Sequence, residues 1–235
     1  MADELEALWS KLTFTEEGED IELGSDGTRA AREIGKNCLV MKILTQRTIV
    51  PDALRKHLKK LWKLNKGLLV SEIEEELYLV EFGDGRDKKR FLEMCPWSYE
   101  KQLILLQDFE GERVPKDITL KWTSFWVQIY NLPLMSMTRE PGMEIGAKIG
   151  SVLEVDVPEK GVQWGKFLCV KVRIHATKKL IRGKKVTIEG GETRWVFFKY
   201  ERLPNFCYRY GRLDHGEKEC LEKKHRDNGG NEEGL

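Results

Sequence analysis

The order of apolar segments in the first half of the chain restricts its fold more than any other feature. Short apolar runs predict strands, and leucines at helical spacing after Pro51 predict an amphipathic helix. The expected elements are, in order, strand 38–44, a helix beginning at Pro51, strands 68–73 and 77–82, helix 87–94 and strand 103–106. This βαββαβ order is typical of ferredoxin-like domains, so residues 36–110 are expected to form one α+β unit.

RNA recognition motifs share this order, but they bind RNA with exposed aromatic residues on their first and third strands. The first predicted strand has no aromatic residue, and the third has only Tyr78 and Phe82. These two alternate with Leu77 and Leu79, so one of the two pairs must face a core. An RNA recognition motif is therefore not expected here.

The second half of the chain predicts an antiparallel sheet over residues 120–200. Its expected elements are strands 124–130, 151–157, 167–176, 180–188 and 193–199, a helix at 143–149, and a hairpin turn at Gly190-Gly191. Alternation in the third of these strands places one set of side chains on a single face, namely Phe167, Cys169, Lys171, Arg173 and His175. Basic residues are therefore expected to share a surface of this sheet.

Near the C-terminus, Cys207, His215 and Cys220 keep the spacing of a C-x2-C-x4-H-x4-C zinc knuckle. Such a pattern brings three thiolates and one imidazole onto a tetrahedral zinc ion. Tyr210 occupies the position of the second cysteine, and a phenol is a poor ligand because it is protonated at neutral pH.

The missing thiolate leaves two alternatives for this segment. Zn2+ is bound by the three remaining ligands, with water, Asp214 or His225 as the fourth, or the segment is a remnant that binds no zinc. Its aromatic and basic side chains suit stacking on unpaired bases and contact with phosphates; they are Phe206, Tyr208, Arg209, Tyr210 and Arg212. For Phe206, packing against the preceding sheet is the alternative.

Two blocks of sequence, Phe198–Cys207 and Phe125–Pro133, together with the knuckle, resemble plant zinc-knuckle proteins of the CCHC type. In that family a plant-specific domain of unknown function precedes the knuckle, and many members are parts of LINE-type retroelement proteins. The resemblance extends over about residues 36–222. It implies a plant domain at 36–200, a degenerate knuckle at 201–222, nucleic-acid binding and zinc binding, without a known catalytic activity.

The distribution of charge agrees with a nucleic-acid partner. Residues 160–188 contain nine bases and no acid, which is typical of a surface that contacts a phosphate backbone. Eight of these bases are candidate contacts: Lys166, Lys171, Arg173, Lys178, Lys179, Arg182, Lys184 and Lys185. The alternative is a solvated strand face whose charges are balanced by neighbouring acids.

The ends of the chain and its cysteines indicate the setting. An acidic leader at 1–35 and a polar, glycine-rich tail at 223–235 are expected to be mostly disordered. Five scattered cysteines favour a reducing compartment, the nucleus or cytoplasm, with Cys38, Cys95 and Cys169 as small core residues. No membrane span or secretory signal is expected.

No catalytic motif stands out in the sequence: it has no phosphate-binding loop, no G-x-S-x-G elbow and no H-E-x-x-H. An enzyme or a small-molecule substrate is therefore not expected. The leading hypothesis is a protein that binds single-stranded RNA or DNA through its basic sheet and knuckle. The alternative is a protein-interaction scaffold whose knuckle has lost its zinc.

Overall fold

The computed structural model describes residues 24–62, 67–188, 190–216 and 220. The chain divides into two units, residues 1–33 and 34–235, and helix α2 (Ser25–Gly35) crosses the boundary between them. Helix α2 is an unpredicted element, because residues 1–35 were expected to form a mostly disordered leader. The rest of that leader, and the C-terminal tail, lie outside the described residues. Among the described helices, none combines the length and apolar character that a membrane crossing requires.

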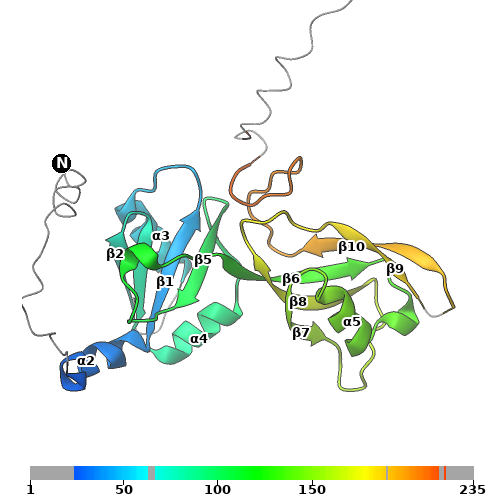
Figure 1. The fold of residues 1–235 in the computed structure, drawn as a ribbon, viewed down its shortest axis with the longest axis horizontal. Helices are drawn as coiled ribbons and strands as arrows, with labels where there is room; N and C mark the ends of the chain where they lie inside the picture. Colours follow the sequence, from blue (N-terminus) through cyan, green and yellow to red (C-terminus); the bar gives the residue numbers. More distant parts are fainter. Residues whose placement is uncertain (1–23, 63–66, 189, 217–219, 221–235) are drawn as a thin grey trace, which may run out of the picture. The chain divides into compact units, whose positions relative to one another are not determined.

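The first sheet of the larger unit has the predicted βαββαβ order (Figure 1). Its elements are β1 (Cys38–Leu44), α3 (Pro51–Leu61), β2 (Leu68–Glu74), β3 (Leu77–Phe82), α4 (Gly85–Glu93), β4 (Trp97–Tyr99) and β5 (Gln102–Asp108). The strands lie in the order β2-β3-β1-β5-β4, and every neighbouring pair is antiparallel. The ferredoxin-like prediction is confirmed, with the short β4 as an unpredicted strand at the edge.

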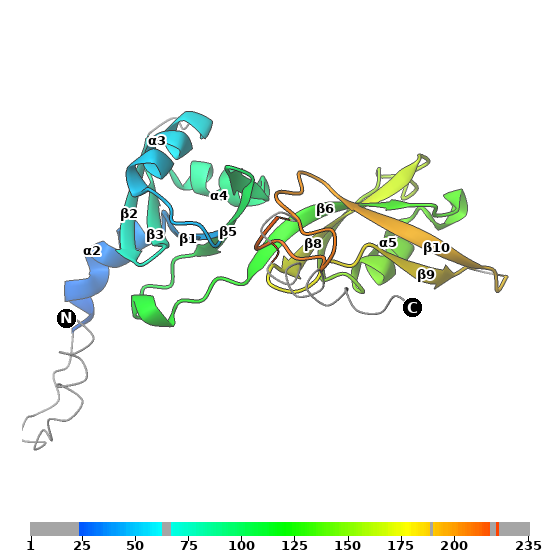
Figure 2. The same ribbon diagram turned by 90° about the horizontal axis from the view of Figure 1, so that it is seen from above.

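Both faces of this sheet are covered. Leu54 and Leu58 of α3 and Phe91 of α4 pack with Tyr78 and Phe82 of β3, each of which is 2% exposed. The opposite face is apolar as well, and the connection after β5, with its short helix η1 (Pro115–Asp117), packs near β2. Figure 2 shows the two helices and this green connection on opposite sides of the sheet. The sheet therefore has no exposed aromatic pair of the kind that RNA recognition motifs use.

The start of α4 corrects one sequence prediction. The helix expected at 87–94 begins two residues earlier, at Gly85. The Asp84 carboxylate accepts a hydrogen bond from the backbone N–H of Arg86 at 2.9 Å and so caps the first turn. The helix ends before the Cys95-Pro96 bond, as expected.

The second sheet contains five antiparallel strands in the order β7-β8-β6-β10-β9. Its elements are β6 (Trp122–Tyr130), η2 (Leu134–Ser136), α5 (Arg139–Gly146), β7 (Ser151–Asp156), β8 (Phe167–His175), β9 (Gly183–Thr187) and β10 (Thr193–Tyr200). Gly190 and Gly191 have φ angles of +95° and +84°, which glycine adopts freely, and they form the predicted turn between β9 and β10.

Helix α5 covers one face of this sheet by packing against β7 and β8. At Gly142 an added Cβ would lie 2.7 Å from Val155, and at Gly146 an added Cβ would lie 2.7 Å from Val152. These two glycines let the helix backbone approach the sheet closely. The predicted helix at 143–149 was placed too late, because glycines weaken the helical signal in the first turns of α5.

Candidate metal centre and basic surface

A tight turn shapes the knuckle segment. The backbone N–H of Gly211 donates to the carbonyl of Cys207 at 2.7 Å, and the N–H of Cys207 donates to the carbonyl of Arg212 at 2.9 Å. Gly211 has a φ of +73°, a conformation that side chains other than glycine rarely adopt. The turn closes the chain on itself directly after Cys207, as a compact ligand loop requires.

The three predicted ligands come together. The two sulfur atoms of Cys207 and Cys220 and one imidazole nitrogen of His215 all lie within 4.8 Å of one another. The residues are buried, with exposed fractions of 0%, 6% and 8% in the same order. Sulfur and nitrogen donors at this mutual distance match the donor types and size of a tetrahedral zinc site.

The imidazole of His215 is oriented for metal binding. Its Nδ1 lies 2.9 Å from Oδ1 of Asp214, while its Nε2 is buried and has no hydrogen-bond partner among the described residues. When Nδ1 carries the proton, Nε2 presents a lone pair, which is the usual arrangement of a zinc-bound histidine with a carboxylate behind it. An orphaned buried nitrogen is costly, and a metal ion would satisfy it.

Asp214 was one of the candidate fourth ligands, and the structure gives it another role. Burial raises the pKa of its carboxyl, but hydrogen bonds from Arg212 and His215 outweigh burial and hold that pKa below its ordinary value. The guanidinium of Arg212 donates to Asp214 through Nε at 3.1 Å and also through Nη2. The other candidate, His225, lies outside the described residues. Tyr210 is half-buried, with its ring centroid 5.8 Å from Nζ of Lys179.

The knuckle is anchored to the second sheet. Phe206 and Leu213, which are 7% and 0% exposed, belong to the same core as the inner strand residues. The backbone N–H of Leu180 donates a hydrogen bond to the carbonyl of Gly211 at 2.8 Å. Leu180 therefore contacts the knuckle and lies outside β9. That strand begins at Gly183 and not at the predicted residue 180. Phe206 thus packs against the sheet, which is the alternative to base stacking that the sequence leaves open for it. Tyr208, by contrast, is 63% exposed.

The alternation predicted for β8 is confirmed. Leu168, Val170 and Val172 are fully buried under α5, and the intervening residues face the other side, called here the open face. All five strands contribute alternate residues to the open face. They are Trp122, Ser124, Trp126, Gln128 and Tyr130 of β6; Ser151, Glu154 and Asp156 of β7; Phe167, Cys169, Lys171, Arg173 and His175 of β8; Gly183, Lys185 and Thr187 of β9; and Thr193, Trp195, Phe197 and Lys199 of β10.

The eight predicted basic contacts do not form one surface. Lys171, Arg173 and Lys185 lie on the open face, where the cations of Lys171 and Arg173 lie 5.7 Å from the rings of Trp126 and Trp122, respectively. Nζ of Lys171 also donates to the carbonyl of Glu93 at 2.9 Å. The others lie elsewhere: Lys184 faces the opposite side of β9, Lys166 and Arg182 lie in connections, and Lys178 and Lys179 follow β8.

Cys169 also departs from its prediction as a core residue. It lies half-buried on the open face, with its Sγ 3.8 Å from Oε1 of Glu201. Burial, together with the charges of Glu201 and Asp156, raises the pKa of the Cys169 thiol to about 12, so the thiol stays protonated near neutral pH. Cys38 and Cys95 are buried as predicted.

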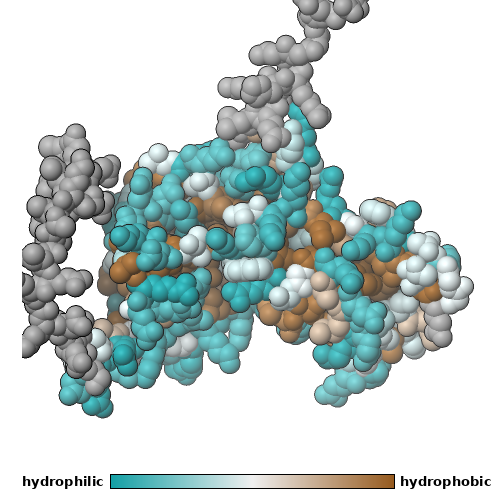
Figure 3. All heavy atoms as spheres, viewed as in Figure 1, coloured by the Kyte–Doolittle hydropathy of each residue, from teal (hydrophilic) through white to brown (hydrophobic). Residues whose placement is uncertain are grey.

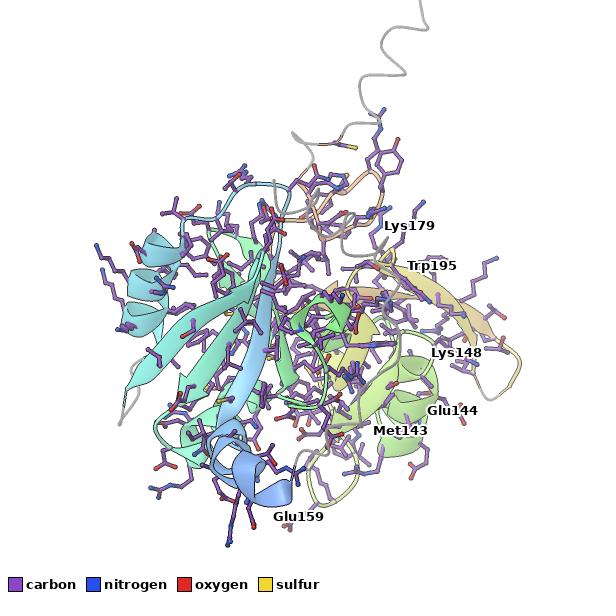
Figure 4. All side chains as sticks on the ribbon, turned by 60° about the vertical axis from the view of Figure 1, so that its left-hand side comes forward. Met143, Glu144, Lys148, Glu159, Lys179 and Trp195 are labelled. Carbon is purple, nitrogen blue, oxygen red and sulfur yellow. The ribbon has the colours of Figure 1, made fainter. Side chains whose placement is uncertain are left out.

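The exposed aromatic residues of β10 are not among the site residues predicted from the sequence. Trp195 and Phe197 are 47% and 53% exposed, and Figure 4 labels Trp195 on the β9–β10 hairpin. Alternation within 193–200 could have revealed them, since Val196, Phe198 and Tyr200 are the buried set. In the space-filling view, apolar residues reach the surface over the second sheet (Figure 3).

Comparisons with known proteins agree with this organisation. Residues 174–222 match the family model described as "Zinc knuckle", and residues 32–116 match the model "Domain of unknown function (DUF4283)". An uncharacterized protein from Arabidopsis thaliana, At4g02000, is 25% identical over 135 residues. That match covers 56% of this chain and 42% of the relative, so the chain corresponds to less than half of that protein.

One solved structure in the comparison is the RNA binding domain of Hrp1 in complex with RNA. It aligns with 59% of this chain and 81% of its own, at 12% identity and a TM-score of 0.25. A TM-score of this size supports no conclusion about fold or ligand. The two family matches show a DUF4283 domain at residues 32–116 and a zinc knuckle of the CCHC type at residues 174–222, in the order that the sequence resemblance implies.

Proposed function

We propose that this protein binds single-stranded RNA or DNA, and that its knuckle holds Zn2+ through Cys207, His215 and Cys220. The observation that carries the proposal is the cluster of two thiol sulfurs and one imidazole nitrogen within 4.8 Å of one another, inside a segment that matches the zinc-knuckle family. Zinc knuckles are modules that bind single-stranded nucleic acid.

The proposed zinc ion has a structural role. All three of its ligands are buried, so the ion would cross-link the loop from Cys207 to Cys220. The coordination position that Tyr210 leaves open has no catalytic motif of the sequence beside it. We therefore infer a binding function and not a catalytic one.

The surface beside the knuckle offers the contacts that nucleic acid needs. Tyr208 is exposed, and its ring packs against that of Phe206 in a T-shaped contact with centroids 5.0 Å apart, so the buried Phe206 supports the Tyr208 ring. Arg209, Lys178 and Lys179 are also exposed. A supported aromatic ring next to cations is the combination that stacks on an unpaired base and contacts its phosphates.

We expect the purified chain to bind a labelled single-stranded oligonucleotide with an affinity that falls steeply as salt rises. Each phosphate contact releases counterions, so the slope of log K against log salt should be about −0.7 for each contact. Fluorescence anisotropy at low and moderate salt measures this slope, with the double variant Lys178→Gln/Lys179→Gln expected to have a shallower one. Absence of binding at low salt would refute the proposal and favour a protein-interaction scaffold.

Asp214→Asn is expected to weaken zinc binding. The carboxylate of Asp214 fixes the ring of His215 by accepting from Nδ1, and loss of such an outer partner typically lowers metal affinity about 10–100-fold. Competition with a chromogenic chelator measures the zinc affinity, and Asp156→Asn on the distant strand β7 is the matched control. Equal affinities for the wild type and both variants would show that His215 does not bind the metal through Nε2.

A further inference from the structure

Three aromatic residues form a row across the open face. Phe197 of β10 lies directly opposite Tyr130 of β6, and Tyr130 lies directly opposite Phe167 of β8. The rings of Tyr130 and Phe167 have centroids 5.1 Å apart. The hydroxyl of Tyr130 donates to Oε1 of Gln128 at 2.8 Å, which fixes the middle ring of the row. Three strands thus present their rings at one level of the sheet.

The end of the row on β10 is unusually exposed. Phe197 is 53% exposed and Trp195, two residues earlier on the same face, is 47% exposed. Gly183 of β9 lies opposite Phe197 of β10. A Cβ added at Gly183 would lie only 2.6 Å from Nε1 of Trp195. The indole therefore lies over the glycine, where any larger side chain would displace it. Two adjacent large rings held in water are costly unless a ligand covers them.

Charge decides which ligand fits these rings. Lys185 pairs with Trp195, and Lys199 is the next open-face residue after Phe197, so cations flank the exposed rings on both sides. Both lysine side chains are exposed. Two acids on the open side of β7, Glu154 and Asp156, pair with β8 at the other edge of the sheet. A third acid, Glu201, accepts a hydrogen bond from Gln128 at 2.7 Å. Rings interleaved with cations match the alternation of bases and phosphates in a single strand.

We propose that Trp195, Phe197 and Tyr130, with Lys185 and Lys199, form a second binding site for single-stranded nucleic acid, on which unpaired bases stack. This second site rests on the proposed function, because it would bind the same ligand, single-stranded nucleic acid. The cations near the knuckle then engage one part of the strand and the row another. No sequence readout is required of either site, because every base has a face that can stack.

Substitutions at Phe197 separate stacking from simple burial of apolar surface. Phe197→Leu keeps an apolar side chain but loses the ring, and should weaken binding of a labelled poly-U oligonucleotide about tenfold, the order expected for one stacked base. Phe197→Tyr keeps the ring and should retain wild-type affinity. Trp195→Leu should weaken binding to a similar extent. Met135→Ala, which removes an exposed apolar side chain of η2, is the control and should have no effect.

The outcomes distinguish this site from the proposed function as a whole. A wild type that fails to bind the oligonucleotide refutes both. A wild type that binds, with Phe197→Leu and Trp195→Leu binding equally well, refutes the second site and leaves the knuckle as the binding surface. Unchanged oligonucleotide binding together with variants that lose self-association in sedimentation would show that another copy of the chain, and not nucleic acid, covers the row. Near-ultraviolet circular dichroism confirms that each variant is folded.

Discussion

Replacing Tyr210 by cysteine is expected to raise the zinc affinity of this protein by on the order of a hundredfold, because it completes a set of ligands that is otherwise in place. Cys207, His215 and Cys220 already lie within 4.8 Å of one another, so the remaining cost of forming the site is small. A thiolate supplies a charged, soft donor where the phenol offers a protonated one. Chelator competition measures the affinity.

Tyr208→Cys is the matched control for this experiment. It adds a thiol two residues away, at an exposed position outside the ligand spacing, and should leave zinc affinity unchanged. Substitution of Co2+ for Zn2+ gives a second measurement. The thiolate-to-cobalt charge-transfer absorption should be stronger in Tyr210→Cys than in the wild type, because the number of thiolate ligands rises from two to three. If Tyr210→Cys and the wild type bind zinc equally, then Tyr210 does not occupy a ligand position or another residue already completes the site.

Local patterns in the sequence were sufficient for most of the fold. The apolar spacing after Pro51 and the alternation in 167–175 predict α3 and the two faces of β8, because both depend on periodicity alone. Helix α5 was placed four residues late, since Gly142 and Gly146 serve packing against the sheet and not helix propensity. The three-residue strand β4 is too short to give a periodic signal.

Only part of the candidate site could be predicted from the sequence, because ligand spacing does not determine the contacts around the ligands. Ligand spacing predicts which residues meet, and the cluster of Cys207, His215 and Cys220 agrees with it. Burial of Phe206 depends on tertiary contacts that no spacing encodes. Asp214 adjoins His215 in the sequence, but the ligand spacing alone does not predict that its carboxylate pairs with the imidazole. The basic block failed as a single surface because neighbours in a strand, such as Lys184 and Lys185, point to opposite faces.

The knuckle should behave as part of the second sheet's core and not as a separate finger. Leu213 is fully buried in that core, so Leu213→Ala is expected to lower the free energy of unfolding of the unit by about 2–5 kcal/mol. Urea unfolding followed by circular dichroism measures this loss. Leu153→Ala is the matched control, since Leu153 is 54% exposed and its truncation should cost no more than about 0.5 kcal/mol.

The same coupling predicts how zinc acts on stability. If the knuckle unfolds together with the sheet, zinc at 100 times its dissociation constant should raise the free energy of unfolding by about 2.7 kcal/mol, because the metal binds the folded state. An independent finger would bind zinc without shifting the transition of the sheet, and Leu213→Ala would then be as mild as Leu153→Ala. Since Leu180 donates to Gly211 and Leu213 fills the core, cooperative unfolding is the expected result. Zinc would then stabilise the sheet that carries the proposed second site.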